Sequence, residues 1–133
     1  PHEAPTRLVS QVIQALLDGK TPLVTAGGLI RDYSHVSDIA GAFAALVDSD
    51  VRGVVNIASG NPVTLKDIAI SAARIMGKPN LAESIAESIP KGEPARIVAD
   101  VRRLREEVGW TPRYNLRKEL EETLQGWKEA REH

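Results

Sequence analysis

Helical periodicity dominates this chain, and only one segment has the composition of a buried strand. Residues 54–58 form a mostly apolar run, VVNIA, between Gly53 and Gly60, which is typical of a strand inside a parallel sheet. Such a strand needs neighbours on both sides, yet the chain offers only two weaker extended segments, residues 22–25 and 30–35. We therefore expect an α-rich α/β domain that cannot build a doubly wound sheet and completes its packing against residues outside this chain.

Five helices are expected. The first covers residues 5–18, where apolar residues recur every three or four positions and Gly19 suits a left-handed C-cap. A tight loop at Gly27 and Gly28 follows the first extended segment. Ser37 or Asp38 is predicted to cap the second helix. The apolar face of that helix comprises Ile39, Ala42, Phe43, Leu46 and Val47.

The third helix has the clearest start signal in the chain. Thr64 and Asp67 form a variant of the capping box, and an apolar periodicity follows. Residues 80–99 lack a sustained period and predict a loop with at most one helical turn. Asp100 is expected to cap a short fourth helix that reaches Val108. The last helix is predicted from the spacing of Leu116, Leu120, Leu124 and Trp127.

Composition narrows the class of protein. The 133 residues are 42% hydrophobic, which suits one domain with a core, and 17 basic against 18 acidic side chains give no net field for nucleic acid or an anionic membrane. The absence of cysteine, of a signal peptide and of a membrane-spanning run predicts a cytoplasmic protein. Because the chain begins with Pro1 instead of methionine, we expect a processed or excised piece.

Four motifs, in order, carry a family resemblance. The segment from Gly27 to Ala40 reads GGLIRDYSHVSDIA, and GVVNIASG, DVRRL and GWTP follow it. Together they resemble the C-terminal half of the extended short-chain dehydrogenase/reductase family, that is, NAD-dependent sugar-nucleotide epimerases and dehydratases such as UDP-glucose 4-epimerase. The resemblance implies that residues 1–133 are one C-terminal substrate-binding domain. It also implies a missing N-terminal Rossmann domain that binds NAD or NADP, and a homodimeric full-length protein.

Arg31 is the first candidate for a functional residue. A guanidinium beside a glycine-rich loop can grip a diphosphate bidentately, while Gly27 and Gly28 would let the ligand approach the backbone. Without the resemblance, an ordinary surface ion pair would be the simpler interpretation. The resemblance implies that Arg31 helps to hold the diphosphate of a nucleotide-sugar. It assigns Asp32 and Asp38 structural roles in fixing the loop and the start of the second helix.

The other binding candidates depend on the resemblance. It places Val24 and Ala26 beside the nucleobase, although packing at a sheet edge would explain them equally well. Relatives often carry Arg-x-Gly-Asp/Glu in the late loop, and here the arginine position holds a proline. Lys91 or Arg96 would then supply the second positive charge, and Glu93 would reach a ribose hydroxyl or remain a solvated carboxylate. Asn56 is expected to be a structural amide.

We predict no catalytic residue, no bound cofactor and no metal site in this chain alone. No glycine-rich fingerprint follows a strand. Tyr114 and Lys118 match the spacing of the superfamily's catalytic pair, but they lie at the entry to the last helix and are interpreted as a coincidence. The metal prediction rests on His2, His35 and His133, which lack paired ligand spacing. Trp110 and Trp127 are expected to pack between the last helices.

Two alternatives remain open at this point. The chain could be a free-standing, α-rich binding module without catalysis, which should expose no large apolar patch. It could also belong to a reductase or dehydrogenase of the same family that acts on a non-nucleotide substrate. The Arg31 motif argues against the second alternative, whereas the proline at position 90 favours it.

Overall fold

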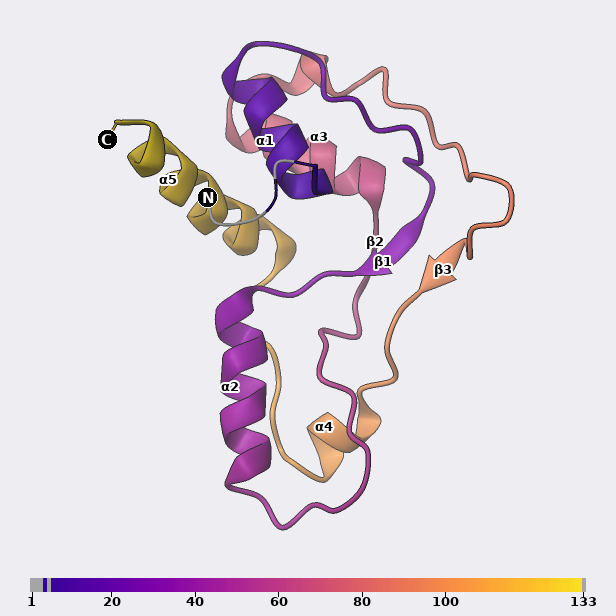
Figure 1. Ribbon diagram of the computed structural model, residues 1–133, viewed down its shortest axis with the longest axis vertical. Helices are drawn as coiled ribbons and strands as arrows, with labels where there is room; N and C mark the ends of the chain where they lie inside the picture. Colours follow the sequence, from indigo (N-terminus) through magenta and orange to yellow (C-terminus); the bar gives the residue numbers. More distant parts are fainter. Residues whose placement is uncertain (1–3, 5, 133) are drawn as a thin grey trace.

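The described part of the computed structural model, residue 4 and residues 6–132, is α-rich, as expected. The helices are α1 (Leu8–Leu17), α2 (Val36–Val47), α3 (Leu65–Ile75), the 3-10 turn η1 (Pro79–Leu81), α4 (Arg102–Glu106) and α5 (Leu116–Glu132). The strands are β1 (Ile30–Asp32), β2 (Pro62–Thr64) and β3 (Arg96–Ile97). In Figure 1, α1, α3 and α5 gather at one end, α2 and α4 lie at the other, and the strands connect the two ends.

The three short strands form one sheet in the order β2-β1-β3. The central strand β1 runs antiparallel to β2, with Ile30 opposite Thr64. It runs parallel to β3, with Arg31 opposite Ile97. The expected extended segment after the double glycine is thus a strand for three residues. The sheet is too small to form a layer, but it places Arg31 next to the late loop.

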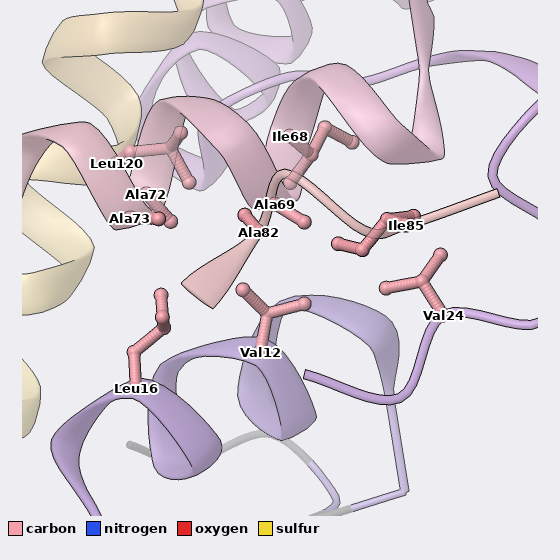
Figure 2. Close-up of a cluster of buried hydrophobic side chains, with 10 residues drawn as sticks. All are labelled: Val12, Leu16, Val24, Ile68, Ala69, Ala72, Ala73, Ala82, Ile85 and Leu120. Atoms are coloured by element: carbon pink, nitrogen blue, oxygen red, sulfur yellow. The ribbon is translucent and has the colours of Figure 1, made fainter. Parts of the chain in front are cut away.

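The main core lies between α1, α3 and α5. Figure 2 shows Val12 and Leu16 of α1 facing the small side chains of α3, with Ile85 and Val24 closing one side. Ala69, Ala72 and Ala73 of α3 are completely buried. Because these side chains are small, α1 and α3 can approach closely. This end of the molecule therefore supplies both sides of its own core.

Helix ends agree with the sequence signals in most places. The Thr64 hydroxyl accepts the Asp67 backbone N–H at 2.9 Å, and the Asp67 carboxylate accepts the Thr64 N–H at 3.3 Å, which confirms the capping box. Gly19 takes the expected left-handed conformation (φ 71°) after α1. The predicted start of α1 at residue 5 lies outside the described residues, and the helix begins at Leu8.

Two predicted caps are corrected. The N-cap of α2 is His35, whose Nδ1 accepts the Ser37 backbone N–H at 3.2 Å, so neither Ser37 nor Asp38 caps the helix. Asp38 is unavailable because its carboxylate binds another segment. Val101 is the N-cap of α4, although the neighbouring Asp100 carboxylate still accepts the Arg102 N–H at 3.0 Å.

The predicted buried strand at residues 54–58 is wrong. No strand forms there, Val54 is 85% exposed, and the backbone groups of residues 55–58 bond to no other described residue. The physical reason is that no second strand of this chain lies beside the segment, and a strand exists only through its ladder partner. Residues 22–24 likewise form no strand and lead into a turn at 25–28.

Only part of the predicted apolar face of α2 is buried. Ala42 is completely buried, and the Trp110 ring packs beside Gly41, so this tryptophan packs against α2 and not between the last helices as predicted. Phe43 and Val47, however, are 56% and 81% exposed. The apolar stripe of α2 therefore points partly into solvent.

No described helix is long and apolar enough to span a membrane.

Candidate functional site

Strand β1 fixes the backbone of Arg31, and two carbonyl groups orient its guanidinium. Nη1 donates to the carbonyl oxygens of Ile30 at 2.8 Å and Pro94 at 3.0 Å, and Nη2 lies 3.5 Å from Oε2 of Glu93. The side chain is only 20% exposed. The fold thus brings together Arg31 and Glu93, two candidates that are far apart in sequence, and holds the guanidinium in one orientation.

Asp32 is a structural hub at the end of β1. Its carboxylate accepts the Ser59 N–H at 3.0 Å, the Ser59 hydroxyl at 2.6 Å, the Gly60 N–H at 2.9 Å and the Ala99 N–H at 3.2 Å. These bonds join two loops to the strand that carries Arg31. The structural role predicted for Asp32 agrees with this geometry.

Asp38 has a similar role on α2. It is 3% exposed, and its carboxylate accepts the backbone N–H groups of Arg113 at 3.1 Å and Tyr114 at 3.0 Å. The carboxylate therefore joins the first turn of α2 to the entry of α5. A buried carboxylate satisfied by backbone donors is not free to bind a ligand.

Gly27 and Gly28 leave room for the backbone of residues 86–87, which packs against them. A Cβ on Gly28 would lie 2.5 Å from the carbonyl oxygen of Glu87, and one on Gly27 would collide with the carbonyl of Ala86. The Gly28 N–H donates to Ser88 O at 3.1 Å. The expectation that these glycines admit a ligand is corrected, because a neighbouring loop already occupies that side of the turn.

The two candidates for the nucleobase differ in accessibility. Val24 is 9% exposed and belongs to the main core (Figure 2), so only its backbone could border a base. Ala26 is half-buried in the turn that follows. Between them, Thr25 is exposed, and its carbonyl accepts the Ser88 hydroxyl at 2.6 Å.

The register of β1 and β3 separates the two candidate arginines. Arg31 stands beside Ile97, and Ile30 stands beside Arg96. Since successive side chains of a strand alternate between faces, Arg31 and Arg96 point to opposite faces of the sheet. Lys91 is exposed in the turn before Gly92, on the same loop as Glu93. The register therefore separates Arg96 from Arg31, whereas Lys91 shares the exposed loop with Glu93.

Tyr114 and Lys118, whose spacing matches the superfamily's catalytic pair, contact each other through the tyrosine ring. The Lys118 ammonium lies over the Tyr114 ring, 4.6 Å from its centroid, and the His35 ring stacks on the tyrosine at 4.3 Å. Desolvation, followed by the Glu122 carboxylate, raises the pKa of Tyr114. The Tyr114 ring thus contacts both His35, at the start of α2, and Lys118, in the first turn of α5.

A pocket of about 590 Å³ between α1, α3 and α5 was not anticipated from the sequence. Val9, Ile68 and Trp127 contribute to its apolar walls, and Glu119 and Glu122 give it an acidic side. Burial raises the pKa of Glu119, whose Oε1 accepts the His35 backbone N–H at 3.1 Å. The spacing of apolar residues on α5 was the feature of the sequence that could have indicated this pocket. Two carboxylates make the pocket unsuited to a diphosphate.

The remaining predicted residues are structural or lie outside the described residues. The Asn56 amide donates to Asp100 O at 3.1 Å, which agrees with a structural amide. No group of metal-binding side chains occurs among residue 4 and residues 6–132. His2 and His133 fall outside that range.

Comparisons with known proteins agree on one group of enzymes. A profile of the family described as GDP-mannose 4,6 dehydratase matches residues 1–123. UDP-glucose 4-epimerase of Azospirillum brasilense is 27% identical, over 96% of this chain and 39% of its own length.

Two solved structures extend the comparison. The dTDP-glucose 4,6-dehydratase of Bacillus anthracis, in complex with NAD, superimposes with a TM-score of 0.80 and 25% identity, over 99% of this chain and 42% of that one. MoeE5, in complex with UDP-glucose and NAD, gives a TM-score of 0.78 and 28% identity, over 98% and 44%. This chain therefore spans less than half the length of these relatives.

Proposed function

The chain belongs to the GDP-mannose 4,6 dehydratase family, and from that premise we propose that it is the substrate-binding part of an NAD-dependent nucleotide-sugar epimerase or dehydratase. Its resemblance to extended short-chain dehydrogenases/reductases is confirmed, and it corresponds to their C-terminal portion. In this proposal the chain holds the nucleotide diphosphate so that the sugar faces a nicotinamide bound by the rest of the protein.

The observation that carries the proposal is the fixed guanidinium of Arg31. Its Nη1 is held by two backbone carbonyls, while Nη2 lies 3.5 Å from Glu93 on an exposed loop. A guanidinium already held in place loses little side-chain entropy when it binds an oxyanion. Lys91 would add a second charge, the backbone of residues 24–26 would border the base, and Glu93 would approach the ribose. Arg96 is the weaker candidate because its side chain points to the face of the sheet opposite that of Arg31.

The binding of NAD or NADP is assigned to a domain upstream. The described residues contain no glycine-rich loop between a strand and a helix that could cradle a dinucleotide, so they do not fit the cofactor on their own. The nicotinamide, when bound, would supply the hydride chemistry. The task of this chain is to position the sugar, which lowers the entropic cost of reaction.

Exposed apolar surface supports a missing partner domain. Val36, Phe43 and Val47 lie along one side of α2 and are 75%, 56% and 81% exposed. Next to α4, residues 55–58 carry backbone groups without partners among the described residues. A free-standing binding module should cover such a surface, so these features weigh against that alternative. In the full-length protein, which we expect to be a homodimer, the missing domain would cover it.

The role of Arg31 can be tested in the full-length protein. Arg31→Ala should weaken binding of a nucleotide-sugar about 10- to 150-fold, as expected for the loss of a charge-assisted hydrogen bond, and should leave NAD binding almost unchanged. Isothermal titration with each ligand measures both effects. Arg117→Ala is the matched control, because Arg117 is 79% exposed and its ion pair among the described residues is with Glu121. An equal loss of both ligands in Arg31→Ala would contradict the assigned role.

The existence of the upstream domain has its own test. The intact mass of the native gene product in its source cells should be roughly 35 kDa if a dinucleotide-binding domain of ordinary size precedes these residues. A native mass close to the 14.4 kDa of this chain would instead support the free-standing module.

A further inference from the structure

The contact between Arg31 and Glu93 has a consequence for ligand binding at the proposed site. Nη1 of Arg31 is committed to the carbonyls of Ile30 and Pro94, which leaves Nη2 and Nε to bind an oxyanion. Glu93 already places a carboxylate oxygen 3.5 Å from Nη2. Among the described residues, Glu93 is the only acidic partner of this guanidinium.

A diphosphate needs the same donors. Carboxylate and phosphate oxygens bind a guanidinium in the same way, through its planar fork. Two anions at this site would repel each other at a separation of a few ångströms. The Glu93 side chain must therefore move away before a diphosphate can take the full fork of Arg31.

The loop around Glu93 can release the side chain without disturbing the sheet. Residues 91–95 are exposed, and Gly92 has a φ of 87° with no atom within 4 Å of where a Cβ would lie. On the other side of Glu93, the carbonyl of Pro94 stays bound to Arg31, and Ala95 O accepts the Ile30 N–H at 2.8 Å. Rotation of the Glu93 side chain therefore requires no change in the hydrogen bonds of the sheet.

We infer that Glu93 and an incoming diphosphate compete for Arg31, so that Glu93 acts as an internal counter-ion that lowers the affinity of the site. This inference rests on the proposed function, because it takes Arg31 as the diphosphate ligand. It differs from a ribose contact in the sign of its effect. A counter-ion weakens diphosphate binding, whereas a ribose contact strengthens nucleotide binding and leaves a ligand without ribose unaffected.

Inorganic pyrophosphate distinguishes the two roles, because it contains the diphosphate and no ribose. In the full-length protein, Glu93→Gln should tighten pyrophosphate binding about two- to fivefold by isothermal titration, the range expected for a partly exposed ion pair. Unchanged or weaker pyrophosphate binding would overturn the inference. If the pyrophosphate affinity is unchanged and UDP binds more weakly, Glu93 acts as a ribose contact alone.

Two further variants complete the experiment. Glu87→Gln is the matched control: Glu87 lies on the same long loop, is 73% exposed and pairs with Lys66, so its loss should leave pyrophosphate affinity unchanged. In an Arg31→Ala background, Glu93→Gln should lose its effect, because the two residues act as one unit. If Arg31→Ala alone leaves pyrophosphate binding intact, the proposed function fails. If Arg31→Ala weakens binding but Glu93→Gln does not tighten it, only the counter-ion fails.

Discussion

The two ends of the molecule use similar apolar sequences with different results. At one end, α1, α3 and α5 enclose a core in which Val12, Leu16 and Ile68 are at most 1% exposed. At the other end, which we call the α2 end (α2, residues 51–60 and residues 101–106), Ala42, Val101 and Leu104 form a small buried cluster, while Val47 and Val54 lie in solvent. An apolar pattern shows which side chains favour burial, but it does not show whether the partner belongs to the same chain.

Polar bonds hold the α2 end in place where apolar packing is thin. Asp38 joins α2 to the entry of α5, and Asp32 joins β1 to the loops at Ser59 and Ala99. The two carboxylates accept backbone N–H groups that would otherwise lack partners. The arrangement of the candidate site therefore depends on these bonds as well as on the core.

Truncating one valine at each end should give very different losses of stability. Val12→Ala, in the core, should lower the free energy of unfolding by about 2–3 kcal/mol, because it removes two fully buried methyl groups. Val47→Ala on the exposed side of α2 should change it by less than about 0.5 kcal/mol. Urea denaturation of both variants measures the contrast. Equal losses would show that the two ends are packed alike, and a larger loss for Val47→Ala in the full-length protein would show that the proposed upstream domain covers α2.

A smaller effect is expected at the connection between the ends. Asp32→Asn should cost about 2 kcal/mol, since the amide cannot accept all the hydrogen bonds that the carboxylate accepts. Asp48→Asn, at an exposed aspartate after α2, is the control and should be nearly neutral. The same denaturation experiment applies, and a neutral Asp32→Asn would refute the role of Asp32 as a hub.

The smallest effect concerns residues 55–58. Their amides should exchange with solvent freely in this chain, and at least about tenfold more slowly in the full-length protein if an upstream sheet orders them, which corresponds to about 1.4 kcal/mol of local stability. Hydrogen exchange followed by mass spectrometry measures both states. The amide of Ala72, inside α3, is an internal reference that should be protected in both proteins. Equal exchange rates at residues 55–58 in this chain and in the full-length protein would mean that the rest of the protein supplies no strand partner for them.

Local signals predicted local structure well. The capping box at Thr64 and the left-handed Gly19 were predictable because each depends on a few neighbouring residues. The structural roles of Asp32 and Asp38 were anticipated through the family resemblance, but their partners were not. The partners of Asp38, for example, are 75 and 76 residues away along the chain.

Periodicity and short motifs are properties of neighbouring residues, so they predicted the helices, the α-rich class and the candidate Arg31, and the family resemblance added Glu93. The contact between Arg31 and Glu93, the opposite face of Arg96 and the absence of a strand at residues 54–58 emerge only when distant segments come together. The physical reason is that strand pairing, burial and ion pairs depend on segments distant in the sequence, and a strand without its neighbour has nothing to bond with.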